Sequence, residues 1–228
     1  MKTILICSQK GGTSKSTTAT NLSSMLATRG QKTLLVDGDI QGTSMSFSAR
    51  RKAHDFTLKV LNDEQMAVAT AFDSMLEKAS REFEYCVVDL GGYDGNTLRI
   101  ALSSQQVDVA IIPSLPSFAD VETLPHMNEL VSTANEIRGE TMKAYVLFTR
   151  CSTAHRSKVV LHAKDFVAAH CNSLSNLNSL TCERVSYKNA LGLAMSVDEF
   201  EHDSRSRNRK ATEEMNSLFI EIMAILSN

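Results

Sequence analysis

The stretch SQKGGTSKST, residues Ser8–Thr17, decides the fold of this 228-residue chain. It follows a short apolar run with β-branched residues and leads into a segment of helical period. A turn between a strand and the N-terminus of a helix presents backbone N–H groups and the positive end of the helix dipole, which suit a polyphosphate. Lys15 can reach the β- and γ-phosphates, and the Ser16 hydroxyl can take a magnesium position. The stretch therefore predicts a phosphate-binding loop, called the P-loop below.

The P-loop departs from the ordinary pattern G-x-x-x-x-G-K-[ST], because the two glycines of that pattern would fall on Gln9 and Ser14. A lysine-rich turn is the alternative for K-G-G alone. The strand before it, the helix after it and the second lysine with Ser-Thr argue against that alternative. The residues predicted to bind the nucleotide are Gly11, Gly12, Thr13, Ser14, Lys15, Ser16 and Thr17.

Acidic residues follow two further apolar runs. Asp37 and Asp39 lie in LLVDGDIQGTS, and Asp89 ends the run YCVVD. Carboxylates at the carboxyl ends of adjacent parallel strands face the ligand crevice, so they can hold magnesium through water and orient an attacking water. Taken singly, Asp37 or Asp39 could equally be ordinary turn chemistry, since Asp before Gly is common in turns. The predicted metal site is Ser16 with Asp37 and Asp89, the carboxylates acting through water.

Short apolar runs alternate with longer segments of helical period, which is typical of parallel βαβ units. Buried parallel strands read as near-continuous apolar runs, as LLVD, CVVD and VAIIP do here. The predicted strands are Thr3–Ser8, Thr33–Asp37, Tyr85–Asp89, Val107–Ile112, Ala144–Thr149 and a weaker one near Leu180–Val185. The predicted helices are Lys15–Thr28, Glu64–Arg81, Val121–Arg138, Ser157–His170 and Arg209–Leu226. Cys171–Ser179 is the most loop-like stretch.

Length and composition favour one α/β domain spanning residues 1–228, a mostly parallel twisted sheet with helices on both faces. The net charge of −2 argues against a uniformly basic nucleic-acid coat, although a local basic face remains compatible with it. The five scattered cysteines form no C-x-x-C pair, and Cys7 and Cys86 lie in apolar runs, so we expect reduced thiols that fill the core. The first apolar stretch is too short for a signal peptide or a membrane span, which favours the cytoplasm.

Three motifs resemble the ParA/MinD superfamily of P-loop ATPases. Ser8–Thr17 matches its deviant Walker form K-G-G-x-x-K-[ST]-[ST], with Lys10 as the added signature lysine, and Asp37–Gly42 is similar to its switch I motif. Val107–Leu124 is similar to its segment D-x-x-x-I-x-P-x-x-P-S. The chain departs from the family at Ser14, at Ile40 and at Gly91–Gly92. A serine that must adopt positive φ at position 14 would cost about 1 kcal/mol, which would weaken or slow the ATPase.

The resemblance implies an ATP- and Mg²⁺-dependent enzyme in which ATP binding builds a homodimer and hydrolysis to ADP and phosphate takes it apart. The catalytic residues it implies are Lys10, Lys15 and Asp39. Lys10 would touch the ATP of the partner subunit, and Asp39 would position the lytic water. Positioning and charge would carry the catalysis.

The start of the chain directly before its first strand resembles the small plasmid partition ATPases of the ParF or StbB kind. These imply non-specific DNA binding in the ATP dimer, a ParB-like centromere-binding partner and a nucleoid-associated location in the cytoplasm. The candidate DNA contacts are the basic residues Arg150, Arg156, Lys158, Arg184, Lys188, Arg205, Arg207, Arg209 and Lys210. A solvated charged face is the alternative for each of them taken singly.

Two alternatives stay open. Ser14 would also suit a positioning scaffold or adaptor, for example in conjugation, that binds ATP with negligible turnover. A MinD-like membrane ATPase would use a basic amphipathic helix at its end, whereas residues 211–228 place Glu213, Glu214 and Glu221 opposite an apolar face. Anionic lipid repels such a helix. We therefore expect no stable membrane association and a terminal helix that docks on its own core.

Overall fold

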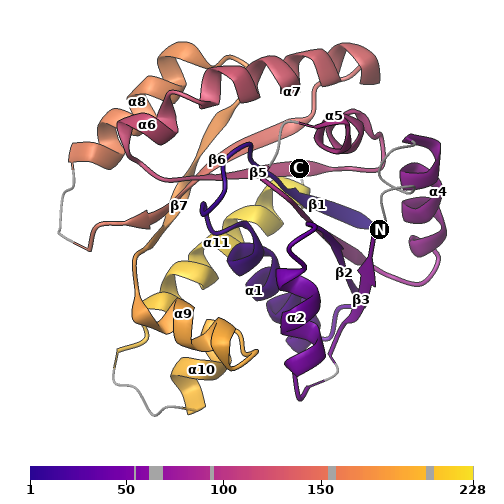
Figure 1. Cartoon of the computed structure of the whole chain (residues 1–228), viewed down its shortest axis with the longest axis vertical. Coiled ribbons are helices and arrows are strands. Elements are labelled where there is room, and N and C mark those ends of the chain that lie inside the picture. Colours follow the sequence, from indigo (N-terminus) through magenta and orange to yellow (C-terminus); the bar gives the residue numbers. More distant parts are fainter. Residues whose placement is uncertain (54, 62–68, 93–94, 154–157, 204–207, 228) are drawn as a thin grey trace.

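A sheet of seven parallel strands forms the centre of the molecule (Figure 1). The computed structural model describes residues 1–228 except 54, 62–68, 93–94, 154–157, 204–207 and 228. The strands stand in the order β3-β2-β4-β1-β5-β6-β7. They are β1 (Lys2–Ile6), β2 (Thr33–Gly38), β3 (Thr57–Val60), β4 (Tyr85–Leu90), β5 (Val109–Ser114), β6 (Lys143–Cys151) and β7 (Ser175–Cys182). The predicted α/β class is confirmed.

Helices cover both faces of the sheet (Figure 1). On one face lie α1 (Lys15–Thr28), α2 (Thr43–Arg50), α9 (Val185–Gly192), α10 (Val197–Asp203) and α11 (Lys210–Ser227). On the other lie α4 (Ala69–Ala79), α5 (Asn96–Ser103), α6 (Phe118–Val121), α7 (Leu124–Arg138) and α8 (Lys158–His170). No helix within the described residues is both long and apolar enough to cross a bilayer.

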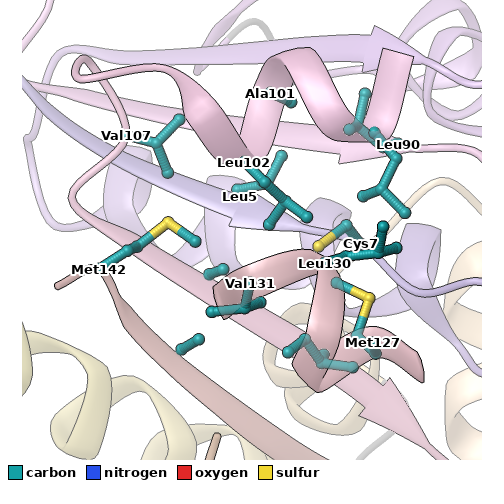
Figure 2. Packing of buried hydrophobic residues seen from close by; sticks show 14 of the residues in the cluster. Leu5, Cys7, Leu90, Ala101, Leu102, Val107, Met127, Leu130, Val131 and Met142 are labelled. Carbon is teal, nitrogen blue, oxygen red and sulfur yellow. The ribbon is translucent and has the colours of Figure 1, made fainter. Parts of the chain in front are cut away.

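Strand alternation divides the buried residues into two layers. In β1, Ile4 and Ile6 pack toward α1 and α11, whereas Leu5 and, just beyond the strand, Cys7 pack toward α5 and α7. Figure 2 shows the second layer, with Cys7 close to the α7 side chains. Cys7 is fully buried and free, as expected of a core-filling thiol, and burial raises its pKa to about 12. The strand β1, which leads to the P-loop, is thus packed on both faces.

The terminal helix docks on the core, as predicted. The buried residues of α11 include Met215, Leu218 and Ile222, which face β1, β4 and α1. Its acidic residues are not all solvated, however. Glu221 accepts hydrogen bonds from the backbone N–H groups of Asn178 and Ser179 in β7. The carboxylates of this helix therefore cap one edge of the sheet, which periodicity alone could not reveal.

The C-terminal part of the sheet was the least well predicted. The last strand is Ser175–Cys182 rather than Leu180–Val185, so much of the stretch expected to be a loop is an edge strand, and Val185 begins α9. Only Leu177 and Thr181 of β7 are buried, which explains why its sequence lacks an apolar run. The edge strand β3 and the short helices α2, α5, α9 and α10 were not predicted.

Two further boundaries were wrong for local reasons. The predicted helix Val121–Arg138 is divided into α6 and α7, and α7 restarts with Pro125 in its first turn. Pro113 lies inside β5 rather than after it. It breaks no ladder bond, because the pairing of β5 with β1 ends at Ile111. The helix predicted from Glu64 is described only from Ala69 to Ala79.

Candidate nucleotide-binding site

A cleft of about 1110 Å³ opens at the carboxyl edge of the sheet. Its walls come from the P-loop and the start of α1, from residues 38–43 and Met45 at and after the end of β2, from Leu90–Gly92 at and after the end of β4, and from Thr181–Arg184 at and after the end of β7. The P-loop follows β1, which stands between β4 and β5. Ligands of open α/β sheets bind at this edge, outside the carboxyl ends of the strands.

The P-loop delivers the N-terminus of α1 to the cleft. Gly12 and Ser14 both adopt left-handed backbone conformations, with φ of 78° and 69°. Ser14 thus has the positive φ that was considered from the sequence. Of the seven residues predicted to bind the nucleotide, all but Thr13 line the cleft. Thr13 is buried, and its hydroxyl contacts that of Ser8 at 2.9 Å.

Lys15 is folded back over the P-loop. Its ammonium donates to the carbonyl of Lys10 at 3.0 Å and to the Ser8 hydroxyl at 3.3 Å. Burial lowers the pKa of Lys15, and the charges of Asp89 and Asp39 partly offset that effect. A side chain on Gly92 would come within 2.8 Å of the Lys15 ammonium, so the glycine pair after β4 leaves the room that this lysine occupies.

Asp37 and Asp89 are register partners on the adjacent strands β2 and β4. The sequence predicted this juxtaposition from their positions at two strand ends. Asp37 accepts hydrogen bonds from the backbone N–H groups of Asp39 and Met45, at 3.0 and 2.6 Å. It therefore shapes the loop of residues 38–42, called the switch loop below. Asp39 itself lines the cleft, in the turn that Gly42 N–H closes onto its carbonyl.

Asp89 is the most perturbed acid of the site. It is fully buried, its Oδ2 accepts a 2.7 Å hydrogen bond from Ser44, and its Oδ1 has no hydrogen-bond partner among the described residues. Burial raises its pKa to about 7, although the nearby hydroxyls of Ser44 and Ser16 act in the opposite sense. A buried carboxylate oxygen without a donor fits the water shell of a hard cation. The residues present therefore fit magnesium, with Ser16 at the edge of the cleft and Asp89 beneath it.

Lys10 points away from the cleft that its own P-loop forms. Its ammonium pairs with Asp120 of α6 at 2.7 Å and donates to the carbonyl of Ala119, while its side chain stays 42% exposed. Burial raises the pKa of Asp120, but the hydrogen bonds from Lys10 and Ser117 outweigh it and hold that pKa below its usual value. Lys10 and Lys15 thus leave the P-loop in different directions, one to each side.

The DNA candidates that the structure describes lie at the cleft, at the start of α8 and at the start of α11. Arg150, Arg184 and Lys188 line the cleft, and each pairs with an acid, Arg150 and Lys188 with Glu183 and Arg184 with Glu214. Lys158 is exposed at the start of α8, and Arg209 and Lys210 are exposed where α11 begins. Arg156, Arg205 and Arg207 lie outside the described residues.

Two functional side chains escaped the sequence reasoning. Ser44, which donates to Asp89, lies in the quoted stretch LLVDGDIQGTS, and Asp120, which holds Lys10, lies in the segment Val107–Leu124. Both motifs were read for their family pattern only. The missing signal was spatial, because each residue meets a partner more than 40 positions away.

Comparison with known proteins agrees with this geometry. A model of the CobQ/CobB/MinD/ParA nucleotide binding domain matches residues 4–175. The chain belongs to this family. It is 53% identical over 45 residues to the chromosome-partitioning ATPase Soj of Treponema pallidum, a match covering 20% of this chain and 18% of Soj. It is 26% identical over 157 residues to the protein ParA of Rhizobium radiobacter, covering 69% and 68% of the two chains.

Solved structures share the fold at low sequence identity. McdA from Cyanothece, in its apo form, has a TM-score of 0.74 and 19% identity, and the alignment covers 94% of this chain and 99% of McdA. The ParA/MinD resemblance is thereby confirmed, and this family member is related to partition proteins.

Proposed function

We propose that this chain is a magnesium-dependent ATPase that dimerises on ATP, binds DNA non-specifically as a dimer and positions a plasmid or another cargo with a partner protein. The observation that carries the proposal is the arrangement of the two lysines. Lys15 lies in the chain's own cleft, whereas Lys10 projects from the same loop toward the outside. A second subunit that faces the P-loop could receive Lys10 at its own nucleotide.

Related structures support the choice of ligand. McdA from Cyanothece has been solved with ATP, and MinD from Pyrococcus horikoshii, with a TM-score of 0.70 at 15% identity, with Mg-ADP. In this chain, the amides of Gly11–Thr17 and Lys15 would bind the phosphates. Ser16, with Asp89 and Asp37 through water, would hold magnesium, which when bound neutralises charge on the β- and γ-phosphates. Asp39 would orient the attacking water.

ATP turnover tests the enzymatic half of this proposal. We expect Lys15→Ala to lose nucleotide binding, because no other side chain of the loop places a cation in the cleft beside it. Asp39→Ala should keep binding and lose hydrolysis by 10²-fold or more, on the order expected for a group that positions the nucleophile. Wild-type turnover in Asp39→Ala would remove Asp39 from its role, and normal ATP affinity in Lys15→Ala would remove the cleft as the site.

A positioning scaffold with negligible turnover is the second candidate, and the left-handed Ser14 favours it. Turnover measured with and without DNA and the cognate partner separates the two. A MinD-like membrane role has less support, since the apolar face of α11 is packed against α1 and the sheet. The location in the cytoplasm on the nucleoid is part of the same proposal.

A further inference from the structure

Helix α10 touches two helices that both begin at the nucleotide site. The P-loop helix α1 reaches it through Asn21, a buried residue whose Oδ1 accepts a 2.8 Å hydrogen bond from the N–H of Val197, the first residue of α10. The amide of Asn21 also donates to the carbonyl of Thr17 at 2.8 Å, which fixes the side chain to the first turns of α1. One end of α10 is therefore anchored to the phosphate-binding helix.

The second connection runs through α2, whose N-terminal end belongs to the metal site. Ser44 donates to Asp89 and the N–H of Met45 donates to Asp37. Any nucleotide or cation that moves these carboxylates or the switch loop acts directly on the first turn of α2. The helix is only eight residues long, so it transmits a displacement of one end to the other.

Arg51, directly after α2, connects the C-terminal end of this helix to α10. Its side chain is 3% exposed, and both ends of its guanidinium bind Glu199 of α10 at 2.9 Å. It also donates to Asp55 and to the carbonyl of Ala194. A bidentate pair of this kind fixes orientation as well as distance.

Packing and a neighbouring arginine stiffen the same joint. The Arg51 guanidinium lies 5.6 Å from the ring centroid of Phe47 and 5.7 Å from that of Phe56, and the two rings stack. Arg50 donates to the carbonyl of Gly192, the last residue of α9, at 2.7 Å. A buried guanidinium with carboxylates on two sides has few alternative arrangements, so α2 and α10 should move together.

We propose that α10 is a sensor of nucleotide state. Arg51 transmits movements of α2 relative to α1 to α10, and through α10 to the start of α11. The output end of this sensor is the contact between α10 and α11. Glu201 of α10 is buried and accepts hydrogen bonds from the N–H and hydroxyl of Thr212 in α11. Arg209 and Lys210, two of the candidate DNA contacts, lie at that end of α11, so the sensor would connect the cleft to the DNA binding of the proposed function, on which this inference rests.

Hydrogen–deuterium exchange followed by mass spectrometry tests the coupling. The comparison is between the nucleotide-free protein and the protein saturated with a non-hydrolysable ATP analogue and Mg²⁺. The readout is the peptide covering Val197–Asp203, because no residue of α10 lines the cleft whereas three of α9 do. We expect its exchange to slow at least threefold in the wild-type protein, and in Arg51→Met to respond less than a third as much.

Arg138→Met is the matched control. Arg138 is equally buried and also binds backbone carbonyls and a glutamate, but it lies at the end of α7 on the other face of the sheet. It should keep the full α10 response. Arg51→Lys covers the case in which Arg51→Met fails to fold. One ammonium cannot hold Asp55 and both oxygens of Glu199, so its response should fall at least twofold.

Analogue binding and oligomeric state are measured on the same samples. A folded Arg51 variant that binds the analogue and retains the full α10 response overturns the inference, as does a wild-type protein that binds the analogue without any α10 response. Loss of the response in Arg138→Met as well would also overturn it, because general softening would then explain the effect. A wild-type protein that binds no analogue contradicts the proposed function instead.

Discussion

At the scale of single residues, burial shifts the pKa values of the charged groups in the site. Asp89 lies under the cleft with one oxygen unpaired, and its pKa is raised to about 7 because burial disfavours the charged form. Lys15, also buried, has a lowered pKa. In the absence of ligands both groups are therefore held closer to neutrality than in water, and a bound cation and polyphosphate would restore their charges.

The first prediction follows from the sign of the Asp89 shift. An unfolded aspartate has a pKa near 3.8 and the folded one about 7, so the folded state binds the extra proton between these values. The free energy of unfolding should therefore fall as pH rises from about 4 to about 7, by up to about 4 kcal/mol if the full shift acts. Urea unfolding at pH 5 and pH 8, in EDTA without nucleotide, measures the part of this loss that lies between those two pH values, up to about 3 kcal/mol. Asp89→Asn should show a markedly smaller loss, and an equal loss in both proteins would contradict the shift.

The second prediction concerns the left-handed serine. Ser14 makes no side-chain capping bond and has φ of 69°, so Ser14→Gly should relieve strain of about 1 kcal/mol, partly offset by the greater freedom of glycine when unfolded. We expect a gain of about 0.5 kcal/mol in the free energy of unfolding and faster ATP turnover. Ser14→Ala keeps the strain and is the control. Equal stability and turnover in the glycine and alanine variants would show that strain at Ser14 has no effect.

At the scale of elements, α11 both packs on the core and binds the edge strand β7. Its apolar side packs on the core, and its acids bind the outer edge of β7, where Glu214 accepts from the backbone N–H of Cys182 and pairs with Arg184. An edge strand with exposed N–H groups is open to unwanted pairing, and these carboxylates occupy them. The helix is therefore part of the sheet's boundary.

This arrangement predicts unequal effects of two neighbouring glutamates. Glu214→Ala removes the partner of a mostly buried arginine and of a strand N–H, so it should lower the free energy of unfolding by about 2 to 3 kcal/mol. Glu213→Ala, exposed on the same helix, should change it by less than about 0.5 kcal/mol. Chemical unfolding of both variants measures these changes. Similar free energies of unfolding for the two variants would show that the Glu214 contacts contribute little.

Sequence reasoning reached the elements whose signal is local. The P-loop, the central strands and α11 were predicted because apolar runs and helical spacing are read directly from the chain. β7 was misplaced because this edge strand has few apolar residues, Leu177, Leu180 and Cys182, and of these only Leu177 is buried. The partners Ser44–Asp89 and Lys10–Asp120 depend on topology. The DNA residues were chosen by charge, yet three of them line the cleft, where Arg150 and Arg184 pair with acids about 30 positions away in the sequence.

At the scale of the whole molecule, the salt dependence of DNA affinity tests the candidate DNA contacts. If phosphate contacts dominate, DNA affinity in ATP and magnesium should fall steeply with salt and hardly vary with sequence. Replacing Arg205, Arg207 and Arg209 together by alanine should reduce the slope of log affinity against log salt by about 2 to 3. The control replaces the exposed Lys59, Lys78 and Arg81, which lie in β3, on α4 and in the turn after α4. Unchanged DNA affinity in the variant that lacks Arg205, Arg207 and Arg209 would show that these arginines do not contact DNA.

The central claim is that Lys15 serves the chain's own nucleotide and Lys10 that of a second subunit. Sedimentation velocity with a non-hydrolysable ATP analogue and Mg²⁺ tests it most directly, with analogue binding measured on the same samples. We predict a dimer for the wild-type protein and, with ATP, for Asp39→Ala, and a monomer that still binds the analogue for Lys10→Ala. A dimer of Lys10→Ala as stable as the wild type, or a wild-type protein that binds the analogue and stays monomeric, would contradict the account.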